Sequence, residues 1–177
     1  DSDLKKIFSK YNMSINVNDI EIYRTSLTHK SYLKISYYEK YGSDFSKYNT
    51  ENAIELRDIS NERLEFRGDA VIKDIVSDYL YERYENEDEG FMTKLKTKIE
   101  NQSSLANFAR LIGIDEFIII SKQNELNGIN RANDKILEDA FEAFIGALKR
   151  DTNYETCEKF IRYILENEID YANLLYN

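Results

Sequence analysis

Proline is absent from this sequence of 177 residues, and there are only six glycines. Proline is the strongest breaker of a helix, because it removes a backbone donor and clashes with the preceding turn. Without it, helices can run uninterrupted over long stretches of the chain.

Cysteine is nearly absent as well. The single residue, Cys157, excludes an internal disulfide, and an intracellular location, cytoplasmic or nuclear, fits it best. Cys157 has no metal-ligand neighbour, so we interpret it as a bystander. No run approaches the roughly 18 apolar residues of a membrane helix, and the first residues carry no apolar run of the secretory kind. We therefore expect no membrane partner.

The sequence also has fewer basic than acidic residues. Lys and Arg number 24 against 33 Asp and Glu, which gives a net charge of −9. This sign is unusual for a protein that binds nucleic acid, because phosphate binding normally leaves a basic footprint. Acidic clusters nevertheless bind metal ions, and those metals can contact phosphate. The charge weakens the case for a nucleic-acid partner without excluding it.

Apolar residues recur at the three- and four-residue spacing of amphipathic helices through most of the chain. Ser60 or Asn61 is expected to cap the longest helix. The expected helices cover residues 3–12, 19–34, 60–84, 91–100, 102–112, 132–150 and 153–172.

Two polar stretches, 35–59 and 123–133, are expected to be loops. The one strand-like run, residues 118–120, is too short to build a sheet. We predict an all-α fold. A single domain is expected over residues 1–177, with its core at about 19–150.

The most informative segment carries three carboxylates at helical spacing. Residues three and four apart share one face of a helix, and like charges stacked in this way repel. Gly68 within the helix costs about 1 kcal/mol relative to alanine, which suggests that something approaches the backbone closely there. Phe66 and Ile72 indicate that the helix packs into the core. The carboxylates are Glu62, Glu65 and Asp69.

A second acidic pair, Asp139 and Glu142, lies in a strongly apolar run. Buried carboxylates need partners or they become neutral, and few cations are nearby. A hard divalent ion such as Mg²⁺, which prefers oxygen ligands, meets that need. Two helices that each offer two carboxylates predict a metal site for phosphodiester hydrolysis, with solvated or ion-paired acidic faces as the alternative.

These segments resemble the ribonuclease III family. The stretch 61–70, NERLEFRGDA, resembles the family motif NERLEFLGDA, and 137–147, LEDAFEAFIGA, resembles its second motif. The segment 27–31, LTHKS, resembles the upstream LTHxS, and 88–96, DEGFMTKLK, resembles the stretch between the two motifs. The four matches occur in the family's order.

The resemblance implies an endonuclease that cuts double-stranded RNA. It leaves 5′-phosphate and 3′-hydroxyl ends with short 3′ overhangs. Mg²⁺, for which Mn²⁺ can substitute, would activate a water and stabilise the departing 3′ oxygen, and Glu62 would assist. The metal ligands implied are Glu65, Asp69, Asp139 and Glu142.

The resemblance also implies a homodimer, in which Phe66 inserts into the partner subunit. Glu89 matches an acidic position near the RNA path of the partner. His29 matches a family position as well. We interpret it as a structural histidine that positions helices rather than as a catalytic base.

Two residues depart from the family pattern. Arg67 replaces an apolar residue, and helical spacing puts it on the face of Leu64 and Val71, so that face is either wet or covered by an arginine whose charge reaches solvent. Glu138 replaces a small residue beside Asp139, where it would change the charge of the site.

The stretch 35–59 is longer than in compact bacterial members, and no residues remain in this chain for a double-stranded-RNA-binding domain. RNA binding then comes from this domain, from a missing segment or from a partner. Each basic candidate for phosphate contact can equally be ordinary solvated charge. These candidates are Lys94, Lys96, Lys98, Arg131 and Lys135.

Two other functions fit less well. A non-catalytic ribonuclease III-like domain that scaffolds RNA typically lacks active-site carboxylates, whereas all four are present here. An all-α nucleotide pyrophosphohydrolase also uses an ExxE pair with Mg²⁺, but it does not explain Gly68 or the LTHKS segment. A di-iron carboxylate bundle needs Glu-x-x-His pairs, and the only histidine is His29.

Overall fold

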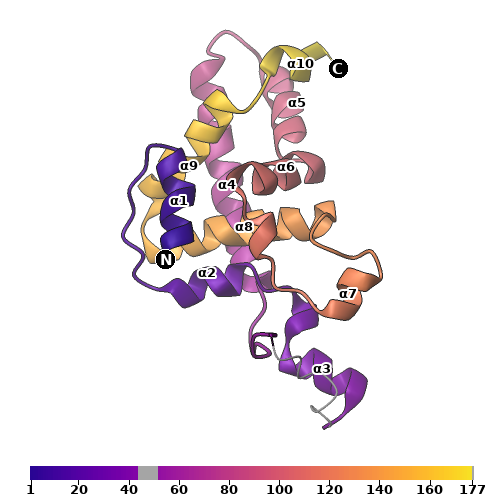
Figure 1. Ribbon diagram of the computed structural model, residues 1–177. Helices are drawn as coiled ribbons and strands as arrows, with labels where there is room; N and C mark the ends of the chain where they lie inside the picture. The colour runs from indigo at the N-terminus through magenta and orange to yellow at the C-terminus, as the bar shows by residue number, and fades with distance from the viewer. Residues whose placement is uncertain (44–51, 177) are drawn as a thin grey trace.

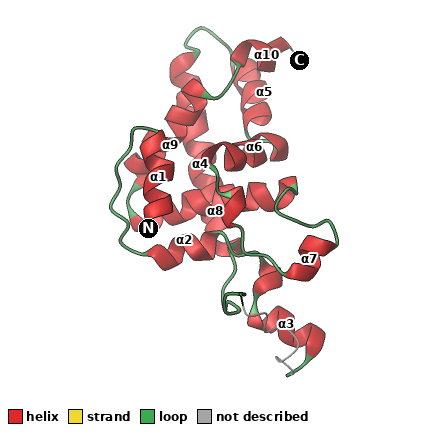
Figure 2. Ribbon diagram, in the orientation of Figure 1, coloured by secondary structure: helices red, strands yellow, loops and turns green. Residues whose placement is uncertain are grey.

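The computed structural model describes residues 1–43 and 52–176, and within this part of the chain every regular element is a helix (Figure 2). The predicted all-α fold is confirmed. None of the described helices is both long and apolar enough to cross a membrane. In chain order the elements are α1 Ser2–Lys10, α2 Ile20–Ser26, the 3-10 turn η1 Lys30–Tyr32, α3 Lys34–Tyr41, α4 Glu62–Arg83, α5 Glu89–Ile99, α6 Gln102–Ile112, the 3-10 turn η3 Asp115–Phe117, α7 Lys122–Leu126, α8 Asp134–Asp151, α9 Tyr154–Asn167 and α10 Tyr171–Tyr176.

Helices α4 and α8 cross at the centre of the molecule (Figure 1). Helices α5 and α9 pack along α4, whereas α2 and α6 pack against α8. Helices α3 and α7 lie together away from this centre (Figure 1). The two segments with paired carboxylates therefore form the two central helices.

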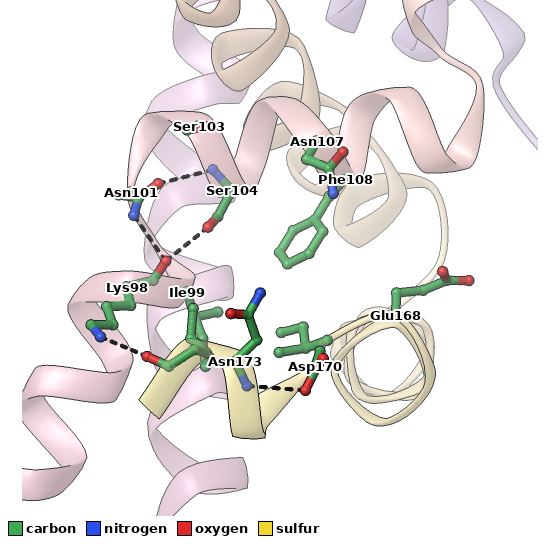
Figure 3. A pocket seen from close by; sticks show the side chains of 12 residues that line it. Lys98, Ile99, Asn101, Ser103, Ser104, Asn107, Phe108, Glu168, Asp170 and Asn173 are labelled. Atoms are coloured by element: carbon green, nitrogen blue, oxygen red, sulfur yellow. Dashed lines mark hydrogen bonds between the residues drawn. The ribbon is translucent and has the colours of Figure 1, made fainter. Parts of the chain in front are cut away.

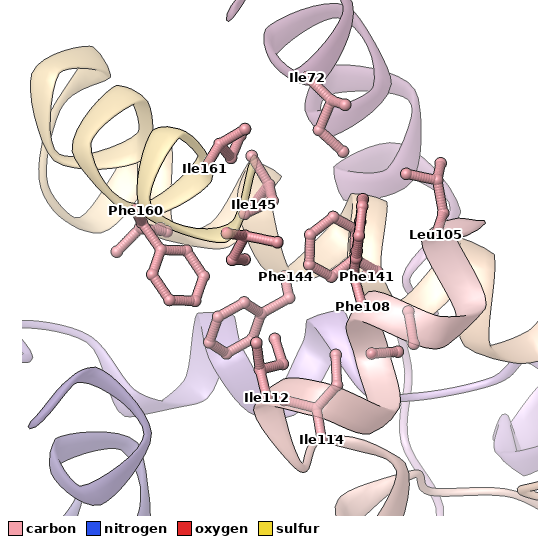
Figure 4. Packing of buried hydrophobic residues seen from close by; sticks show 14 of the residues in the cluster. Ile72, Leu105, Phe108, Ile112, Ile114, Phe141, Phe144, Ile145, Phe160 and Ile161 are labelled. Atoms are coloured by element: carbon pink, nitrogen blue, oxygen red, sulfur yellow. The ribbon is translucent and has the colours of Figure 1, made fainter. Parts of the chain in front are cut away.

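Helix α8 is buried along most of its length, because apolar residues occupy nearly all of its faces. The ring of Phe144 stacks 5.9 Å from that of Phe8 on α1. The ring of Phe141 lies 5.7 Å from that of Phe108 on α6 (Figure 4). The hydrophobic cluster around α8 includes residues of α1 and of α9. It therefore extends beyond residues 19–150 in both directions along the chain.

Polar side chains fix where helices begin. Asn133 Oδ1 accepts a hydrogen bond from the Lys135 amide at 3.0 Å, which satisfies a donor that the first turn of α8 leaves free. Of the two caps expected for α4, Ser60 receives the Glu62 amide, at 3.5 Å. Asn61 occupies the capping position without a side-chain bond to the helix.

The helix expected over residues 19–34 is wrong, because α2 ends at Ser26. There the chain becomes extended and pairs with the loop after α6. The Ile119 amide donates to Leu27 O at 2.8 Å, and the His29 amide donates to Ile119 O at 2.9 Å. These long-range bonds compete with continuation of the helix, and sequence periodicity does not reveal them.

Both expected loops are also partly helical. The stretch 35–59 contains most of α3, which is anchored by the buried ring of Tyr37, and 123–133 contains most of α7. Residues 44–51 of the first stretch lie outside the described residues. The helix expected over 153–172 is two helices, α9 and α10, separated by a short break.

Candidate metal centre

The three carboxylates of α4 stand one turn apart in different surroundings. Glu62 is exposed at the start of the helix, where its carboxylate accepts a hydrogen bond from Ser60 Oγ at 3.1 Å and lies 3.5 Å from Lys30 Nζ. Glu65 is half-buried, and the side chain of Asp69 is 37% exposed. The last two therefore face the interior more than Glu62 does.

The carboxylate of Glu142 on α8 is the most deeply buried of the set, with 7% of the residue exposed. Burial, and next the Asp69 carboxylate, raise the pKa of Glu142 to about 8. Burial and the charge of Asp139 likewise raise the pKa of Glu65. Both shifts have the direction expected where carboxylates crowd together away from water.

Two glycines allow this crowding. A Cβ atom on Gly68 of α4 would lie 1.6 Å from the backbone oxygen of Glu142, and one on Gly146 of α8 would lie 2.2 Å from that of Leu64. The backbones of the two helices therefore touch directly at their crossing. The close approach predicted from Gly68 is confirmed, and its partner is the helix that carries the second acidic pair.

The group formed at this crossing fits a divalent ion. One carboxylate oxygen from each of Glu65, Asp139 and Glu142 lies within 4.8 Å of the other two. Asp139 Oδ1 is buried, and its one near partner among the described residues is Lys135 Nζ, at 2.8 Å. Three convergent carboxylates, which one lysine balances only in part, match the ligands that Mg²⁺ or Mn²⁺ takes.

The fourth predicted ligand, Asp69, is adjacent to this group rather than part of it. Its carboxylate is among the causes, after burial, that raise the pKa of Glu142, and its Oδ2 lies 2.8 Å from Lys73 Nζ. Lys73 was not among the residues singled out from the sequence. Its spacing of four residues from Asp69, typical of a helical ion pair, was the available signal.

A second lysine holds Asp139. Lys135 Nζ lies 2.8 Å from Asp139 and 3.2 Å from Glu138. The Glu138 carboxylate adds to the effect of burial on the pKa of Glu142. The unusual residue beside Asp139 therefore brings extra negative charge to the site, and Lys135 partly balances it.

Comparison with known proteins identifies the family. A model of the ribonuclease-III-like family matches residues 19–168. The chain belongs to the ribonuclease III family. Ribonuclease 3 of Streptococcus pyogenes serotype M5 (strain Manfredo) is 36% identical over 160 residues, which make up 90% of this chain and 61% of that protein. The chain thus spans about three fifths of the length of this curated relative.

Solved structures of ribonuclease III share the fold. The nuclease domain of the enzyme from Campylobacter jejuni, described for structural flexibility in a region involved in dimer formation, superposes with a TM-score of 0.71 and 29% identity, covering 93% of this chain and 97% of that one. Dicer from Pichia stipitis shares the fold alone, with a TM-score of 0.56 and 19% identity over 88% of this chain and 59% of that one.

The ribonuclease III motif also contains Phe66, and this side chain is 82% exposed. The expectation that α4 packs into the core is confirmed, and Ile72 is buried there, but Phe66 takes no part in that packing. Arg67 is exposed beside the buried Leu64 and Val71. The large ring of Phe66 is therefore exposed on the same helix as Glu65 and Asp69.

His29 of the LTHKS segment is held by local contacts. Its Nδ1 accepts the Ser31 amide at 3.2 Å and lies 2.8 Å from Ser31 Oγ. Ser31 Oγ in turn accepts the Ser121 amide at 3.1 Å. Burial lowers the pKa of His29. These contacts join the segment before α4 to the loop before α7, and they favour the structural interpretation of His29.

The other predicted RNA contacts lie apart from the carboxylates. Glu89 and Lys94 are exposed on α5, and Lys96 Nζ donates to Lys73 O on α4 at 3.0 Å. Lys98 Nζ donates to a backbone oxygen of α10 at 2.6 Å, at the edge of a pocket of about 390 Å³ between α5, α6 and α10 (Figure 3). None of the site carboxylates lines that pocket.

Arg131, the remaining basic candidate, lies in the loop before α8. Its guanidinium donates to Ile118 O at 3.1 Å and pairs with Glu125. Arg131 is therefore held by intramolecular contacts, as Lys96 and Lys98 are, whereas Lys135 stands beside the carboxylates.

Proposed function

We propose that this chain is a metal-dependent endoribonuclease domain that hydrolyses phosphodiester bonds in double-stranded RNA. The products are 5′-phosphate and 3′-hydroxyl ends with short 3′ overhangs. The observation that carries the proposal is the convergence of Glu65, Asp139 and Glu142 where α4 and α8 touch. Membership of the ribonuclease III family supplies the reaction that such a site performs.

In this proposal Glu65, Asp139 and Glu142 hold Mg²⁺ or Mn²⁺, and Asp69 completes the set. The bound ion supplies a Lewis acid and an activated water. Glu62, which is fixed by Ser60, assists from the exposed edge of the site. Water is added across the bond between phosphorus and the 3′ oxygen, so its oxygen remains on the 5′-phosphate and a proton goes to the 3′ hydroxyl.

We further propose that residues 1–177 form one domain and that the nuclease works as a homodimer in which Phe66 contacts the partner subunit. We also propose that it works inside the cell. The single free thiol, Cys157, is buried, which agrees with a reducing compartment. Lys94, which is exposed, and Lys135, which pairs with Asp139 and Glu138 at the site, remain the candidates for phosphate contacts, with Glu89 near the RNA path.

The test is the substitution Glu142→Gln, which keeps the shape of the side chain and removes its charge. Cleavage of long duplex RNA in Mg²⁺ should be lost, because the group at the crossing loses one of its three anionic ligands. Duplex binding in Ca²⁺, which accepts looser oxygen geometry, should be largely unchanged. Asp69→Asn should behave in the same way.

The matched control is Glu155→Gln, at an exposed carboxylate on α9, which should cut at the wild-type rate. A Glu142→Gln protein, free of contaminating nuclease, that still cuts duplex RNA at the wild-type rate would refute the proposal. Duplex binding by a wild type that never cuts in Mg²⁺ or Mn²⁺ would instead indicate a scaffold.

A further inference from the structure

The ion pair between Asp69 and Lys73 lies beside the metal group and has no counterpart in the proposed mechanism. Lys73 Nζ lies 2.8 Å from Asp69 Oδ2, and the lysine side chain is 52% exposed. Asp69 is the one predicted ligand that stands outside the compact group of carboxylates. One of its two carboxylate oxygens is thus already paired with a cation.

The main chain of Lys73 is fixed, whereas its ammonium is not enclosed. The Lys73 carbonyl accepts hydrogen bonds from Ser77 Oγ at 2.6 Å and from Lys96 Nζ of α5 at 3.0 Å. The hydrogen bond to Asp69 and the charges of Asp69, Glu100 and Glu142 raise the pKa of Lys73. The ammonium pairs with Asp69 at 2.8 Å, and about half of the lysine side chain is open to solvent. It can therefore leave Asp69 by rotating its side chain, without moving the helix.

We propose that Lys73 is a built-in counter-ion that competes with the metal for Asp69 and, once displaced, contacts the phosphate backbone of the RNA. The inference rests on the proposed function, because it concerns a carboxylate of that site. Without metal, Lys73 offsets the negative charge of Asp69. When Asp69 turns to a metal, the ammonium is released beside the site and becomes available to pair with a phosphate of the RNA. Metal binding and phosphate binding are coupled through one side chain.

The first test is Mn²⁺ binding by calorimetry in the absence of RNA. Lys73→Met should bind Mn²⁺ about two- to fivefold more tightly than the wild type, a factor in keeping with the loss of one half-exposed ion pair. Lys5→Met removes an equivalent pair, Lys5 with Asp1 at 2.8 Å on α1, and should leave the affinity unchanged. Unchanged or weaker Mn²⁺ binding by Lys73→Met would overturn the inference.

A double substitution separates direct competition from a general effect of charge. In an Asp69→Asn background, Lys73→Met should no longer tighten Mn²⁺ binding, because the shared carboxylate is gone. A gain that persists in that background would overturn direct competition. A wild type that binds no Mn²⁺ would refute the proposed function, and with it this inference, whereas equal affinities refute the inference alone.

The second test is duplex RNA binding in Ca²⁺ at several salt concentrations. Lys73→Met should bind more weakly, and the slope of log affinity against log salt should fall in magnitude by about 0.7 to 0.9, as for the loss of one phosphate contact. Circular dichroism before and after shows whether the variant is folded. A folded variant with the wild-type slope would overturn the phosphate contact.

Discussion

At the scale of single residues, the site is defined by an imbalance of charge. Glu65, Asp69, Asp139 and Glu142 lie together with Glu138 close by, and Lys73 and Lys135 provide the only ammonium groups that pair directly with this set among the described residues. The imbalance makes the site ready for a cation. It also makes the stability of the metal-free protein depend on pH.

Glu142 gives the direction of that dependence. Its pKa is raised from an ordinary value of 4.5 to about 8, mainly by burial, so the folded protein holds a proton that the unfolded chain releases. Stability without metal should therefore fall as the pH rises from about 4.5 to about 8 and then level off. Thermal unfolding in a chelator at several pH values measures this.

Glu142→Gln cannot lose that proton, so its melting temperature should change less over the same pH range and exceed that of the wild type at the upper end. Added Mg²⁺ should stabilise the wild type most where Glu142 is ionised, because the ion binds the carboxylate and not the acid. A wild-type melting temperature that rises over this interval in chelator would contradict the assignment.

The residue types of the site were accessible from the sequence, but their pairing was not. Helical spacing placed Glu65 and Asp69 on one face of the first helix. It placed Asp139 and Glu142 on one face of the second helix. The position of the Lys73 ammonium and the burial of Asp139 Oδ1 depend on rotamers and on packing between two helices. Neither property is encoded in the spacing along one helix.

At the scale of elements, the crossing of α4 and α8 decides the geometry of the site. The sequence predicted both helices to within a few residues of their ends, because each is long and strongly periodic. It failed at α2 and α3, where short helices are ended or stabilised by contacts with the distant residues Ile119 and Gln123. Such long-range contacts leave no periodic trace.

Gly68→Ala tests the crossing directly. The added methyl group would meet the Glu142 carbonyl at 1.6 Å, so the helices would have to separate. We expect a loss of about 3 kcal/mol or more in the free energy of unfolding, at or beyond the usual cost of overpacking, together with weaker metal binding. Urea denaturation and Mn²⁺ calorimetry measure the two effects.

The control is Gly90→Ala, because Gly90 is also helical but its added methyl would come no closer than 3.4 Å to a side-chain oxygen of Asp88. This change should be neutral or stabilise the protein by up to about 1 kcal/mol, from the higher helix propensity of alanine. Equal effects of the two substitutions would show that the crossing tolerates separation.

At the scale of the whole molecule, α4 exposes two large aromatic residues, and the proposed homodimer accounts for only one of them. Phe66 is 82% exposed beside the site, whereas Tyr81 is 72% exposed near the other end of the same helix. If Phe66 contacts a second subunit, Phe66→Ser should shift the protein toward the monomer in light scattering at micromolar concentration. Tyr81→Ser should leave the mass unchanged. A wild-type protein that is strictly monomeric would remove the homodimer.

The net charge of −9 also bears on the proposed binding of RNA. With few free basic groups, binding should be weak, and its affinity should depend only modestly on salt, because each phosphate contact adds about 0.7 to 0.9 to the slope. Duplex RNA should be cut in preference to duplex DNA, because A-form shape and 2′-hydroxyls are what such a surface can recognise. Parallel digests of RNA and DNA duplexes of the same sequence measure this, and equal rates would contradict it.

The glycines at the helix crossing affect what a related sequence can reveal about its ancestry and about its catalytic activity. A lineage that stopped cutting RNA would be released from keeping its carboxylates, but not from keeping Gly68 and Gly146, because a methyl group at either position collides with the opposite backbone. These glycines therefore mark inheritance of the architecture and carry no information about turnover. A survey that separates active enzymes from degenerate copies should weigh the acidic positions and disregard the glycines.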